Sequence, residues 1–468
     1  MLPKVSIYIL NYNYGKFIGQ AIESCVDQSF KNIEIIIIDD GSTDNSKDII
    51  QLYARKYPFI KTRFNKNQGL IKSCNHALKL AEGKYILRLD ADDWLDRNAI
   101  EIMFNKMEKN KKIELLFPDY YEIDENNNVL HTIRRHDFKK VKLFDSPAHG
   151  ACTLFRKNTL ISMGGYDENF SCQDGFEIWL RFYKKFKVMN LNLPLFYYRK
   201  HGSNLTTNRN KINFNRNKIL FKHKKNKFKA LAFLPIRGLK YDKFSKIFQK
   251  LGNKKLIDWT IDNLLKVKNL SKIIIASPDD DVLRFIKNKK NNKLLAIKRD
   301  IKLSAQSVLI EDSLINVIKK IKKKKNFNFD YIVMSKLKNP FRNSNHIENA
   351  LNIINIFNLD KVIGVSTENK SFFTHNGNSL KPLRQFDNEK IGNIQQKINI
   401  RVESEEIYKD CGAFAVYDLK YLLSKKKKNN IKIGHELLDQ LSSYQIDSQF
   451  DWIMAQNIAK KVDKYKNL

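Results

Sequence analysis

The sequence predicts an α/β fold divided into two domains, and three observations support this. Short apolar runs alternate with segments of helical periodicity over the first 100 residues, the pattern of a parallel sheet covered by helices. The same alternation begins again after about residue 229. The chain also has 468 residues, more than one ordinary hydrophobic core supports.

The first 100 residues contain three expected strands and two expected helices. Three Ile-rich runs, each too short for a free-standing helix, are expected to be strands: 4–10, 31–39 and 84–90. Two segments with an apolar face are expected to be helices: 44–57 and 69–82. Ser42 is the capping candidate for the first helix, and Gly83 ends the second. This alternation predicts a Rossmann-like, nucleotide-binding type of sheet, whose ligands bind at the carboxyl ends of its strands.

A break in composition separates the two halves of the chain. Residues 208–229 are basic, rich in Asn and poor in apolar periodicity, so we expect a linker there. Beyond it a helix is expected at 254–268. Further apolar runs are expected to be strands: 229–238, 271–281, 329–336, 360–367 and 411–419. The predicted domains are therefore residues 1–215 and 229–468, joined by a basic linker at 216–228.

The chain is strongly basic, with 85 Lys and Arg against 50 Asp and Glu and a formal net charge of +35. Such an excess raises nucleic acid or an anionic membrane surface as partners. The excess is mostly Lys and forms short runs such as 322–325 and 425–428, which favours a solvated surface. A patch for acidic lipid or polymer is the alternative. No aromatic-basic RNA signature or basic recognition helix accompanies the charge, so no nucleic acid is expected.

The cysteines and the N-terminus predict a cytoplasmic protein. Five cysteines are scattered, odd in number and never spaced as C-x-x-C, which argues against a disulfide framework or zinc site and for a reducing compartment. The first residues, MLPKVSIYIL, read as a strand and not as a signal peptide. No run approaches the roughly 18 apolar residues of a membrane span. Any membrane contact is expected at the inner face of the cell membrane, from the surface.

An acidic cluster, LRLDADDWLD, follows the third expected strand. Asp90, Asp92 and Asp93 would repel one another unless a cation or hydrogen-bond donors share them, and a hard divalent ion explains all three. A calcium loop fits poorly, because Leu95 stands at the sixth position, where the sharp turn needs Gly. A helix N-cap explains Asp96 or one other acid, but not three. Mg²⁺ or Mn²⁺ takes one or two carboxylates plus substrate phosphates, which suits a nucleoside diphosphate.

Four stretches of the first half carry a resemblance to a known family. They are VSIYILNYNYGKFIGQAIESCVDQSFKNIEIIIIDDGSTDNS, NKNQGLIKSCNHALKLAEGKYILRLDADDW, GGYDENFSCQDGFEIWLRF and LFYYRKHGSNLT. Together they resemble a family 2 glycosyltransferase of the GT-A fold across roughly residues 3–207. The resemblance implies a metal-dependent, inverting transfer from a nucleotide-sugar donor to a glycan or lipid-linked acceptor, in cell-surface polysaccharide synthesis. Mn²⁺ or Mg²⁺ would be the cofactor.

The resemblance implies roles for individual residues at the strand ends. Asp39 matches the position that reads the nucleotide base, and Asn11 matches the wall beside it. Asp90 and Asp92 match the D-x-D element, with Asp90 towards the ribose and Asp92 towards the metal. Asp93 is adjacent and would share either role, so it is a second metal candidate.

The later motifs supply a candidate base and further ligands. Asp174 in CQDGFEIWLRF matches the general-base position of inverting members, which have Glu-Asp where this chain has Gln173-Asp174. Capping the following helix is the alternative role of Asp174. Arg199 and His201 match an Arg-x-His element near the diphosphate, where Arg199 would bind phosphate and His201 would be a further metal ligand. A structural role is the alternative for His201.

The second half resembles a different family. Its opening at 230–262, ALAFLPIRGLKYDKFSKIFQKLGNKKLIDWTID, and the stretches YIVMSKLKNPFR, HIENAL, KVIGVST, CGAFAVYDL and YQIDSQFDW are similar to acylneuraminate cytidylyltransferases, which make CMP-sialic acids from CTP. The resemblance implies a cytidylyltransferase-like fold. It also marks candidate site residues: Arg237, Lys246, Arg342 and Asp447.

Departures from this second family affect its whole site. The phosphate loop Arg-Gly-Gly-Ser-Lys reads RGLKY at 237–241, where Leu239 and Tyr241 would crowd the cradle. Gln-Pro-Thr-Ser-Pro-Leu-Arg reads KLKNPFR, and one of two metal-binding aspartates is Gln445. Our hypothesis is a degenerate domain for scaffolding or sugar recognition. The alternatives are an active CMP-sugar synthetase (a nucleotidyltransferase) fused to the glycosyltransferase, and a non-enzymatic, basic surface-binding protein.

Overall fold

A computed structural model describes residues 2–133, 150–202, 204, 209–224, 227–243, 245–304, 308–324, 328–368, 373–375, 380–382, 407–424 and 431–461. The chain forms two compact units. The first is Met1–Arg216 with Lys370–Glu405, and the second is Asn217–Asn369 with Glu406–Leu468. Both are α/β, which confirms the predicted fold class.

Within its described residues, the first unit is built around one sheet of nine strands. Eight follow the order β3-β2-β1-β4-β8-β6-β9-β5, and β7 pairs with β6. Their bounds are β1 Val5–Asn11, β2 Ile33–Asp39, β3 Ile60–Phe64, β4 Tyr85–Asp90, β5 Trp94–Leu95, β6 Ile113–Ile123, β7 Val129–Ile133, β8 Leu154–Arg156 and β9 Lys187–Arg199. β3, β2, β1 and β4 are parallel, whereas β8 runs antiparallel between β4 and β6.

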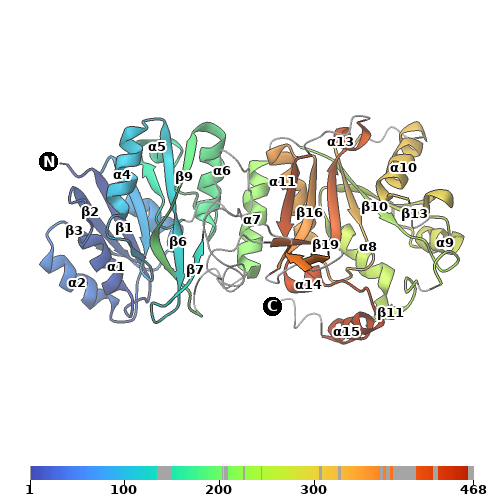
Figure 1. The fold of residues 1–468 in the computed structure, drawn as a ribbon, viewed down its shortest axis with the longest axis horizontal. Helices are drawn as coiled ribbons and strands as arrows, with labels where there is room; N and C mark the ends of the chain where they lie inside the picture. The colour runs from blue at the N-terminus through green and yellow to red at the C-terminus, as the bar shows by residue number, and fades with distance from the viewer. Residues whose placement is uncertain are drawn as a thin grey trace. The chain divides into compact units, whose positions relative to one another are not determined.

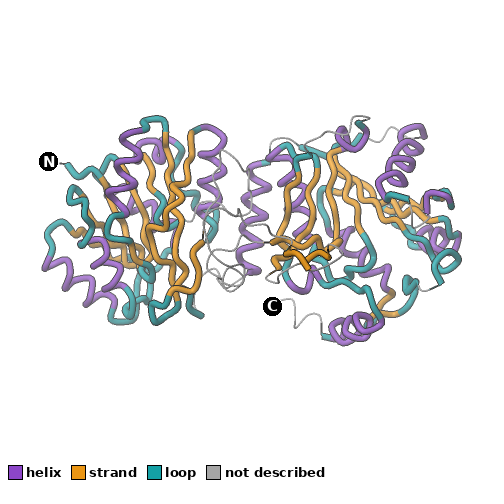
Figure 2. Tube along the Cα trace, viewed as in Figure 1, coloured by secondary structure: helices purple, strands orange, loops and turns teal. Residues whose placement is uncertain are grey.

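Helices flank the strands of each unit (Figure 1; Figure 2). In the first unit they are α1 Ile18–Val26, α2 Ser46–Lys56, α3 Leu70–Leu80, α4 Ala99–Lys109, α5 Lys157–Ser162 and α6 Asp174–Lys185. Strands β1, β2 and β4 and helices α2 and α3 confirm the five elements expected in the first 100 residues. A further helix, α7 Arg209–His223, covers part of the segment where a linker was expected.

The central strands of the first unit are buried along their length. Every residue of β1 and β2 is buried. Continuous apolar runs such as IIII at 35–38 are typical of parallel strands that are covered on both faces. Ile7, Ile9, Ile35 and Ile37 are fully buried in one hydrophobic cluster. Each such side chain contributes about 1.5–3 kcal/mol relative to an exposed one, so the strand ends stand on a rigid base.

Within its described residues, the second unit has a main sheet of seven strands, in the order β14-β13-β10-β15-β19-β16-β20. Their bounds are β10 Ala230–Pro235, β13 Leu270–Ser277, β14 Leu294–Lys298, β15 Tyr331–Ser335, β16 Lys361–Glu368, β19 Ile407–Asp418 and β20 Ile433–Leu437. The first four are parallel neighbours, and β19 is antiparallel to β15 and β16.

Two small strand pairs and several helices complete the described elements of the second half. The pairs are β11 Lys250–Leu251 with β12 Lys254–Lys255, and β17 Phe373–His375 with β18 Leu380–Pro382. The helices are α8 Leu256–Lys266, α9 Asp280–Asn288, η2 Lys302–Ser304, α10 Ile310–Lys324, α11 Ser344–Phe357, α13 Leu419–Leu423, α14 Gln440–Ser443 and α15 Gln449–Lys460. The expected helix at 254–268 is α8.

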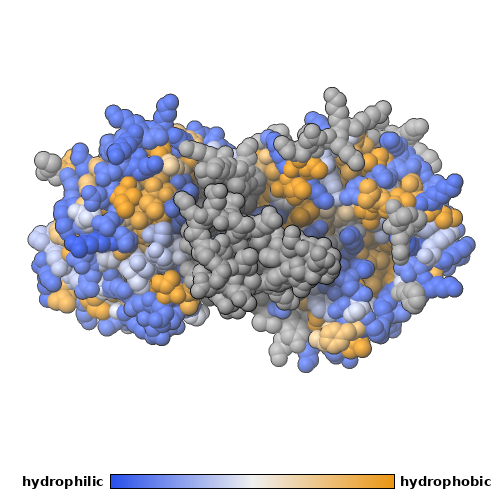
Figure 3. Space-filling view, viewed as in Figure 1, coloured by the Kyte–Doolittle hydropathy of each residue, from blue (hydrophilic) through white to orange (hydrophobic). Residues whose placement is uncertain are grey.

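The surface matches the charged composition of the chain. Hydrophilic residues cover much of the face drawn in Figure 3, with apolar patches between them. Among the described helices, none has the length and apolarity that crossing a membrane requires. All five cysteines are buried and free.

Candidate active site

The carboxyl ends of three parallel strands bring the predicted donor-binding residues together. The register pairs Asn11 of β1 with Asp39 of β2, and Leu10 with Asp90 of β4. The Asn11 side-chain amide donates to Asp39 Oδ2 at 2.7 Å. Because these strands are adjacent and parallel, their last residues meet at one edge of the sheet, where ligands bind in this class of fold.

The loop after β2 is folded onto the Asp39 carboxylate. The backbone N–H groups of Gly41 and Ser42 donate to Oδ1 at 3.2 and 3.0 Å, and the Ser42 hydroxyl donates to Oδ2 at 2.6 Å. Gly41 has φ +84°, and a Cβ there would lie 2.8 Å from the backbone nitrogen of Asn67. Only Gly fits this position. Ser42 therefore anchors the loop and does not cap α2, whose N-cap is Asn45.

The acidic cluster after β4 carries more negative charge than its neighbours compensate. Asp92 and Asp93 are 7% and 1% exposed. Burial, against the opposing charge of Arg88, raises the pKa of Asp90 to about 6. Burial, with Asp92 and Asp90 nearby, raises the pKa of Asp93 well above its usual range. Asp93 Oδ1 accepts from the backbone N–H of Arg199 at 2.9 Å, but Oδ2 has no hydrogen-bond partner within the described chain.

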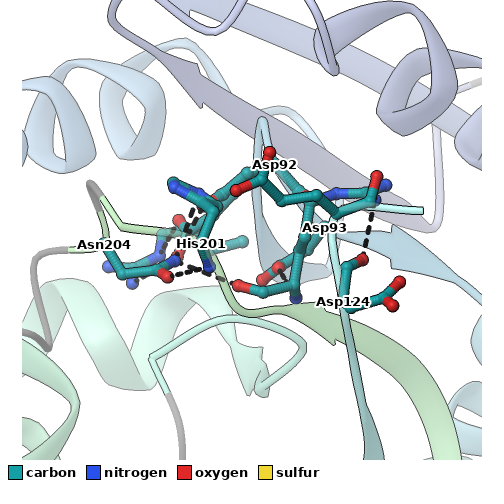
Figure 4. A network of polar contacts seen from close by, with 9 residues as sticks. Asp92, Asp93, Asp124, His201 and Asn204 are labelled. Atoms are coloured by element: carbon teal, nitrogen blue, oxygen red, sulfur yellow. Dashed lines mark hydrogen bonds and ion pairs between the residues drawn. The ribbon is translucent and has the colours of Figure 1, made fainter. Parts of the chain in front are cut away.

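The Asp92 carboxylate lies against an imidazole and an amide from the segment after β9 (Figure 4). His201 Nε2 is 2.9 Å from Asp92 Oδ2, and Asn204 Nδ2 is 3.4 Å from the same oxygen. The backbone N–H of His201 donates to Asn204 Oδ1 at 2.6 Å. The rings of Tyr14 and Phe17 pack against the imidazole, each with a centroid separation of 5.6 Å. His201 thus lies beside Asp92, as a shared ligand role requires.

Arg199 is buried and its guanidinium is hydrogen-bonded to other protein groups, which argues against the phosphate contact expected for it. The side chain is 1% exposed. Its guanidinium donates to the backbone oxygen of Asp92 at 3.0 Å, to Asn127 Oδ1 at 2.9 Å and to Gln20 Oε1 at 2.8 Å. It also lies over the rings of Phe17 and Trp94, at 4.5 and 4.9 Å. All three guanidinium nitrogens therefore bind protein groups. One of these contacts, to the backbone oxygen of Asp92, fixes the loop that carries Asp92.

Asp174 is brought to the same edge by helix α6. It is the first helical residue, and the N-cap is Gln173, with φ 64° and no side-chain hydrogen bond to the helix. Asp174 therefore does not cap the helix. Its Oδ2 accepts a hydrogen bond of 2.6 Å from Nη1 of Arg88 on β4. The same guanidinium pairs with Asp90, at 2.9 Å between Nε and Oδ1 and 3.2 Å between Nη2 and Oδ2.

Sequence reasoning gave no role to Arg88, to Asn204 or to Asp40, although Asp40 follows Asp39 in an acidic pair at the end of an expected strand. Arg88 interrupts the apolar run YILRL, and a charged residue in a buried strand must find a partner, which was the available signal. Asp40 accepts from the backbone N–H groups of Gln68 and Gly69, at 3.1 and 2.8 Å, and so ties the start of α3 to β2. No pattern in the sequence marks Asn204.

The residues fit a divalent cation that is shared with substrate. Among the described residues, no group of three His, Cys, Asp or Glu side chains is arranged to hold a metal alone. Asp93 Oδ2 is nevertheless a buried oxygen without a donor, next to Asp92. Mg²⁺ and Mn²⁺ commonly use one or two carboxylates and complete their shell with phosphate oxygens and water. Asp92 and Asp93 suit that arrangement, with His201 beside them.

The candidates of the second unit bind other residues and not one another. Within the described chain, no hydrogen bond or ion pair joins any two of Arg237, Lys246, Arg342 and Asp447. Lys246 donates to Gln449 Oε1 at 2.8 Å. Asp447 pairs with Lys338 at 2.6 Å, and Arg342 is buried with its donors on Ser335 and on carbonyl oxygens.

The phosphate loop of the second unit differs from expectation in one respect. Leu239 is 47% exposed, so its side chain points to solvent and does not fill the cradle. Arg299, which follows β14, is 6% exposed, and its Nε has no hydrogen-bond partner in the described chain. Burial and the positive charge of Arg237 lower its pKa to about 10. A buried guanidinium with a like charge nearby favours an anion at this edge.

Comparison with known proteins finds one family model that matches part of the first half and another that matches part of the second half. Residues 6–169 match the family model described as glycosyl transferase family 2. Residues 245–428 match the model described as cytidylyltransferase. Both recognitions made from the sequence are confirmed.

Individual relatives match part of the chain. An uncharacterized glycosyltransferase of Methanocaldococcus jannaschii is 33% identical over 188 residues, 38% of this chain and 64% of the relative. The chondroitin synthase of Escherichia coli is 27% identical over 204 residues, 43% of this chain and 30% of the relative. The crystal structure of S. aureus TarS 1-349 in complex with UDP-GlcNAc has a TM-score of 0.39 at 19% identity, and covers 47% of this chain and 66% of that one. The chain thus spans less than two thirds of each curated relative.

Proposed function

We propose that this chain, in which a glycosyl transferase family 2 domain is followed by a cytidylyltransferase-type domain, transfers a sugar from a nucleotide-sugar donor to an acceptor hydroxyl. The observation that carries the proposal is the gathering of acids at one sheet edge. The strand-end residues Asp39 and Asp90 and the helix-start residue Asp174 come from distant parts of the sequence. One guanidinium reaches both Asp90 and Asp174. Donor-binding and proton-accepting groups are therefore within reach of one substrate.

The proposed reaction inverts the anomeric carbon. The acceptor oxygen attacks that carbon, the bond from the carbon to the diphosphate oxygen breaks, and the acceptor proton passes to the Asp174 carboxylate. Asn11 and Asp39 form the wall for the base, and Asp90 faces the ribose. Asp92 and Asp93, with His201, would hold Mn²⁺ or Mg²⁺, which supplies charge neutralisation for the leaving diphosphate.

We propose a glycan or lipid-linked acceptor in cell-surface polysaccharide synthesis. The chondroitin synthase among the relatives supports a saccharide acceptor. The net charge of +35 supports peripheral contact with an anionic membrane surface.

A panel of nucleotide sugars, offered to the full chain with Mn²⁺, tests this function. Cleavage of at least one donor is expected, with loss on adding EDTA and in the variant Asp92→Ala. Cleavage that survives both changes would overturn the metal site. Absence of cleavage for every donor, in the presence of saccharide acceptors, would count against glycosyl transfer itself.

For the second unit we propose anion binding without nucleotidyl transfer. The buried Arg299, with its unpartnered Nε beside Arg237, supports a retained anion site. The replacement of one expected metal ligand by Gln445, and the pairing of Asp447 with Lys338, support the loss of chemistry. CTP is expected to bind in calorimetry, with weaker binding in Arg299→Met. Release of pyrophosphate from CTP and an acylneuraminate would establish an active synthetase instead.

A further inference from the structure

A buried guanidinium joins two carboxylates that have different proposed roles. Arg88 is 5% exposed and stands two residues before Asp90 on β4, on the same face of the strand. It reaches Asp90 through Nε and Nη2, and it reaches Asp174, 86 positions along the chain, through Nη1. Strand β4 and helix α6 are thereby linked at the site itself.

The surroundings leave the guanidinium little freedom. A Cβ at Gly150 would lie 2.6 Å from Arg88 Nη2, so the backbone at that position touches the side chain. Cys74 Sγ lies 3.8 Å from Nη1. The negative charges of Asp174 and Asp90 outweigh burial and raise the pKa of Arg88 well above its usual range. Arg88 is therefore a fixed, permanent cation.

Both carboxylates take their side-chain hydrogen bonds from Arg88. In the described part of the chain, Arg88 is the only side chain that hydrogen-bonds the Asp174 carboxylate, and it engages Oδ2. Asp90 ends strand β4, where it pairs with Leu10 of β1, and in the described chain its carboxylate too has a side-chain hydrogen bond from Arg88 alone. Loss of the guanidinium therefore releases the Asp174 side chain, while the backbone of Asp90 stays paired with β1. A base must lie within hydrogen-bond reach of the proton it takes, so this release bears on the chemical step.

We propose that Arg88 is a positioning residue for glycosyl transfer, which holds the Asp174 carboxylate against the donor-binding Asp90 and leaves Asp174 Oδ1 to receive the acceptor proton. This inference rests on the proposed function. It adds a residue that contacts neither leaving group nor acceptor oxygen in the proposed reaction, and that acts through Asp174.

The fork of the guanidinium is the property to test. In Arg88→Lys the charge remains, but one ammonium has no rigid fork with which to bridge two carboxylates. A base displaced by about 1 Å can lose on the order of 100-fold in rate, so we expect kcat for transfer to fall roughly 10- to 100-fold. The KM for the donor should change less than about threefold, because the metal and diphosphate contacts remain. Arg88→Met removes the charge as well, so its kcat for transfer should be lower than that of Arg88→Lys.

The matched control is Arg181→Lys in the same unit. Arg181 is also a largely buried arginine, and it pairs with Glu177 at 2.7 Å and with the carbonyl oxygens of Met163 and Gly165. Among the residues that the structure describes, its hydrogen bonds and ion pairs go to no proposed site residue. Thermal unfolding of both variants shows whether they destabilise the chain equally, and kcat should stay near wild type in the control alone.

A double variant separates positioning from folding. If Arg88 acts through Asp174, then Arg88→Lys in an Asp174→Asn background should cost no further transfer activity. Additive losses would overturn the proposal, as would a loss of kcat in Arg181→Lys equal to that in Arg88→Lys, or a donor KM that rises while kcat is unchanged. Failure of the wild-type chain to transfer any sugar is a different result, and it would reject the proposed function.

Discussion

The imidazole of His201 lies 2.9 Å from the carboxylate of Asp92, across 109 positions of sequence. The pair joins the turn after β4 to the segment after β9. An imidazole nitrogen and a carboxylate oxygen are ligand types that Mn²⁺ accepts together. This relationship makes metal affinity the first measurable property of the site.

Replacing His201 should weaken the binding of the metal without abolishing it. In His201→Asn we expect the apparent affinity for Mn²⁺, measured by calorimetry with a nucleoside diphosphate present, to fall roughly tenfold, as losses next to a metal commonly do. Asp92→Asn should abolish the Mn²⁺-dependent part of diphosphate binding. His131→Asn, at an exposed position on β7, serves as the control and should bind like wild type. Unchanged Mn²⁺ affinity in His201→Asn would reduce the histidine to a structural role.

Replacing Arg199 should lower the stability of the fold more than it weakens binding of the nucleotide-sugar donor. Its guanidinium holds Asp92 O, Asn127 and Gln20 and stacks on two rings, so Arg199→Met strands several buried acceptors. We expect the free energy of unfolding to fall by about 2–4 kcal/mol, measured by urea denaturation. The neighbouring Lys200→Met, at a half-exposed side chain, should cost under about 1 kcal/mol.

A phosphate contact would give a different pattern at the same position. It would raise the KM for the donor in Arg199→Lys by about tenfold or more while leaving unfolding unchanged, because a charged contact to substrate is worth about 1.5–3 kcal/mol. That pattern would restore the role that the sequence suggested for Arg199.

The sequence was sufficient for the strand-end acids and insufficient for what surrounds them. Asp39 and Asp90 end Ile-rich runs of obvious period, so their meeting at one edge follows from parallel pairing alone. Arg88 and Arg199 show the limit. The partners of Arg88 include a residue 86 positions away, and the burial of Arg199 depends on the ring of Phe17, which precedes α1, and on a ring from β5. Neither side-chain direction nor burial is visible before the fold is known.

Gly41 tests the loop that surrounds Asp39. The change Gly41→Ala should be destabilising for two reasons, the positive φ and the Cβ placed 2.8 Å from a backbone nitrogen. We expect a loss of about 1–3 kcal/mol in unfolding free energy and a raised donor KM, because Asp39 loses its backbone donors. Gly19→Ala in α1 is the control, since a Cβ there meets nothing closer than 3.7 Å. A donor KM equal to that of the wild type in Gly41→Ala would show that this loop does not contribute to binding of the nucleotide base.

We expect His346 to make the stability of the second unit depend on pH. It is 2% exposed and lies between Glu436 Oε1 and Asp439 Oδ2, at 2.9 Å from each. Burial by itself lowers the pKa of this imidazole, but the hydrogen bonds to Asp439 and Glu436 outweigh it and raise the pKa to about 9. The pKa of Asp439 is lowered, because hydrogen bonds from His346 and Ser442 outweigh its burial.

The direction in which stability changes with pH follows from the linkage between proton binding and folding. A histidine whose pKa is higher when folded contributes stability that is fully present below its unfolded value of about 6.5 and is lost as the pH rises through about 9. The lowered pKa of Asp439 adds stability above its unfolded value of about 3.9, which is lost as the pH falls. The contacts of His346 with Glu436 and Asp439 should therefore stabilise the folded second unit most between about pH 4 and 6.5.

Hydrogen exchange in α11 and β20, compared between wild type and His346→Gln at each pH, measures this contribution. The extra protection of the wild type should be largest near pH 6 and should shrink towards pH 9, because the imidazole then loses the charge that holds both carboxylates. His131→Gln, in the first unit, should leave these peptides unchanged at every pH. Protection that stays constant from pH 6 to 9 would mean that His346 is neutral in the folded chain, and that one of its acidic neighbours carries the proton instead.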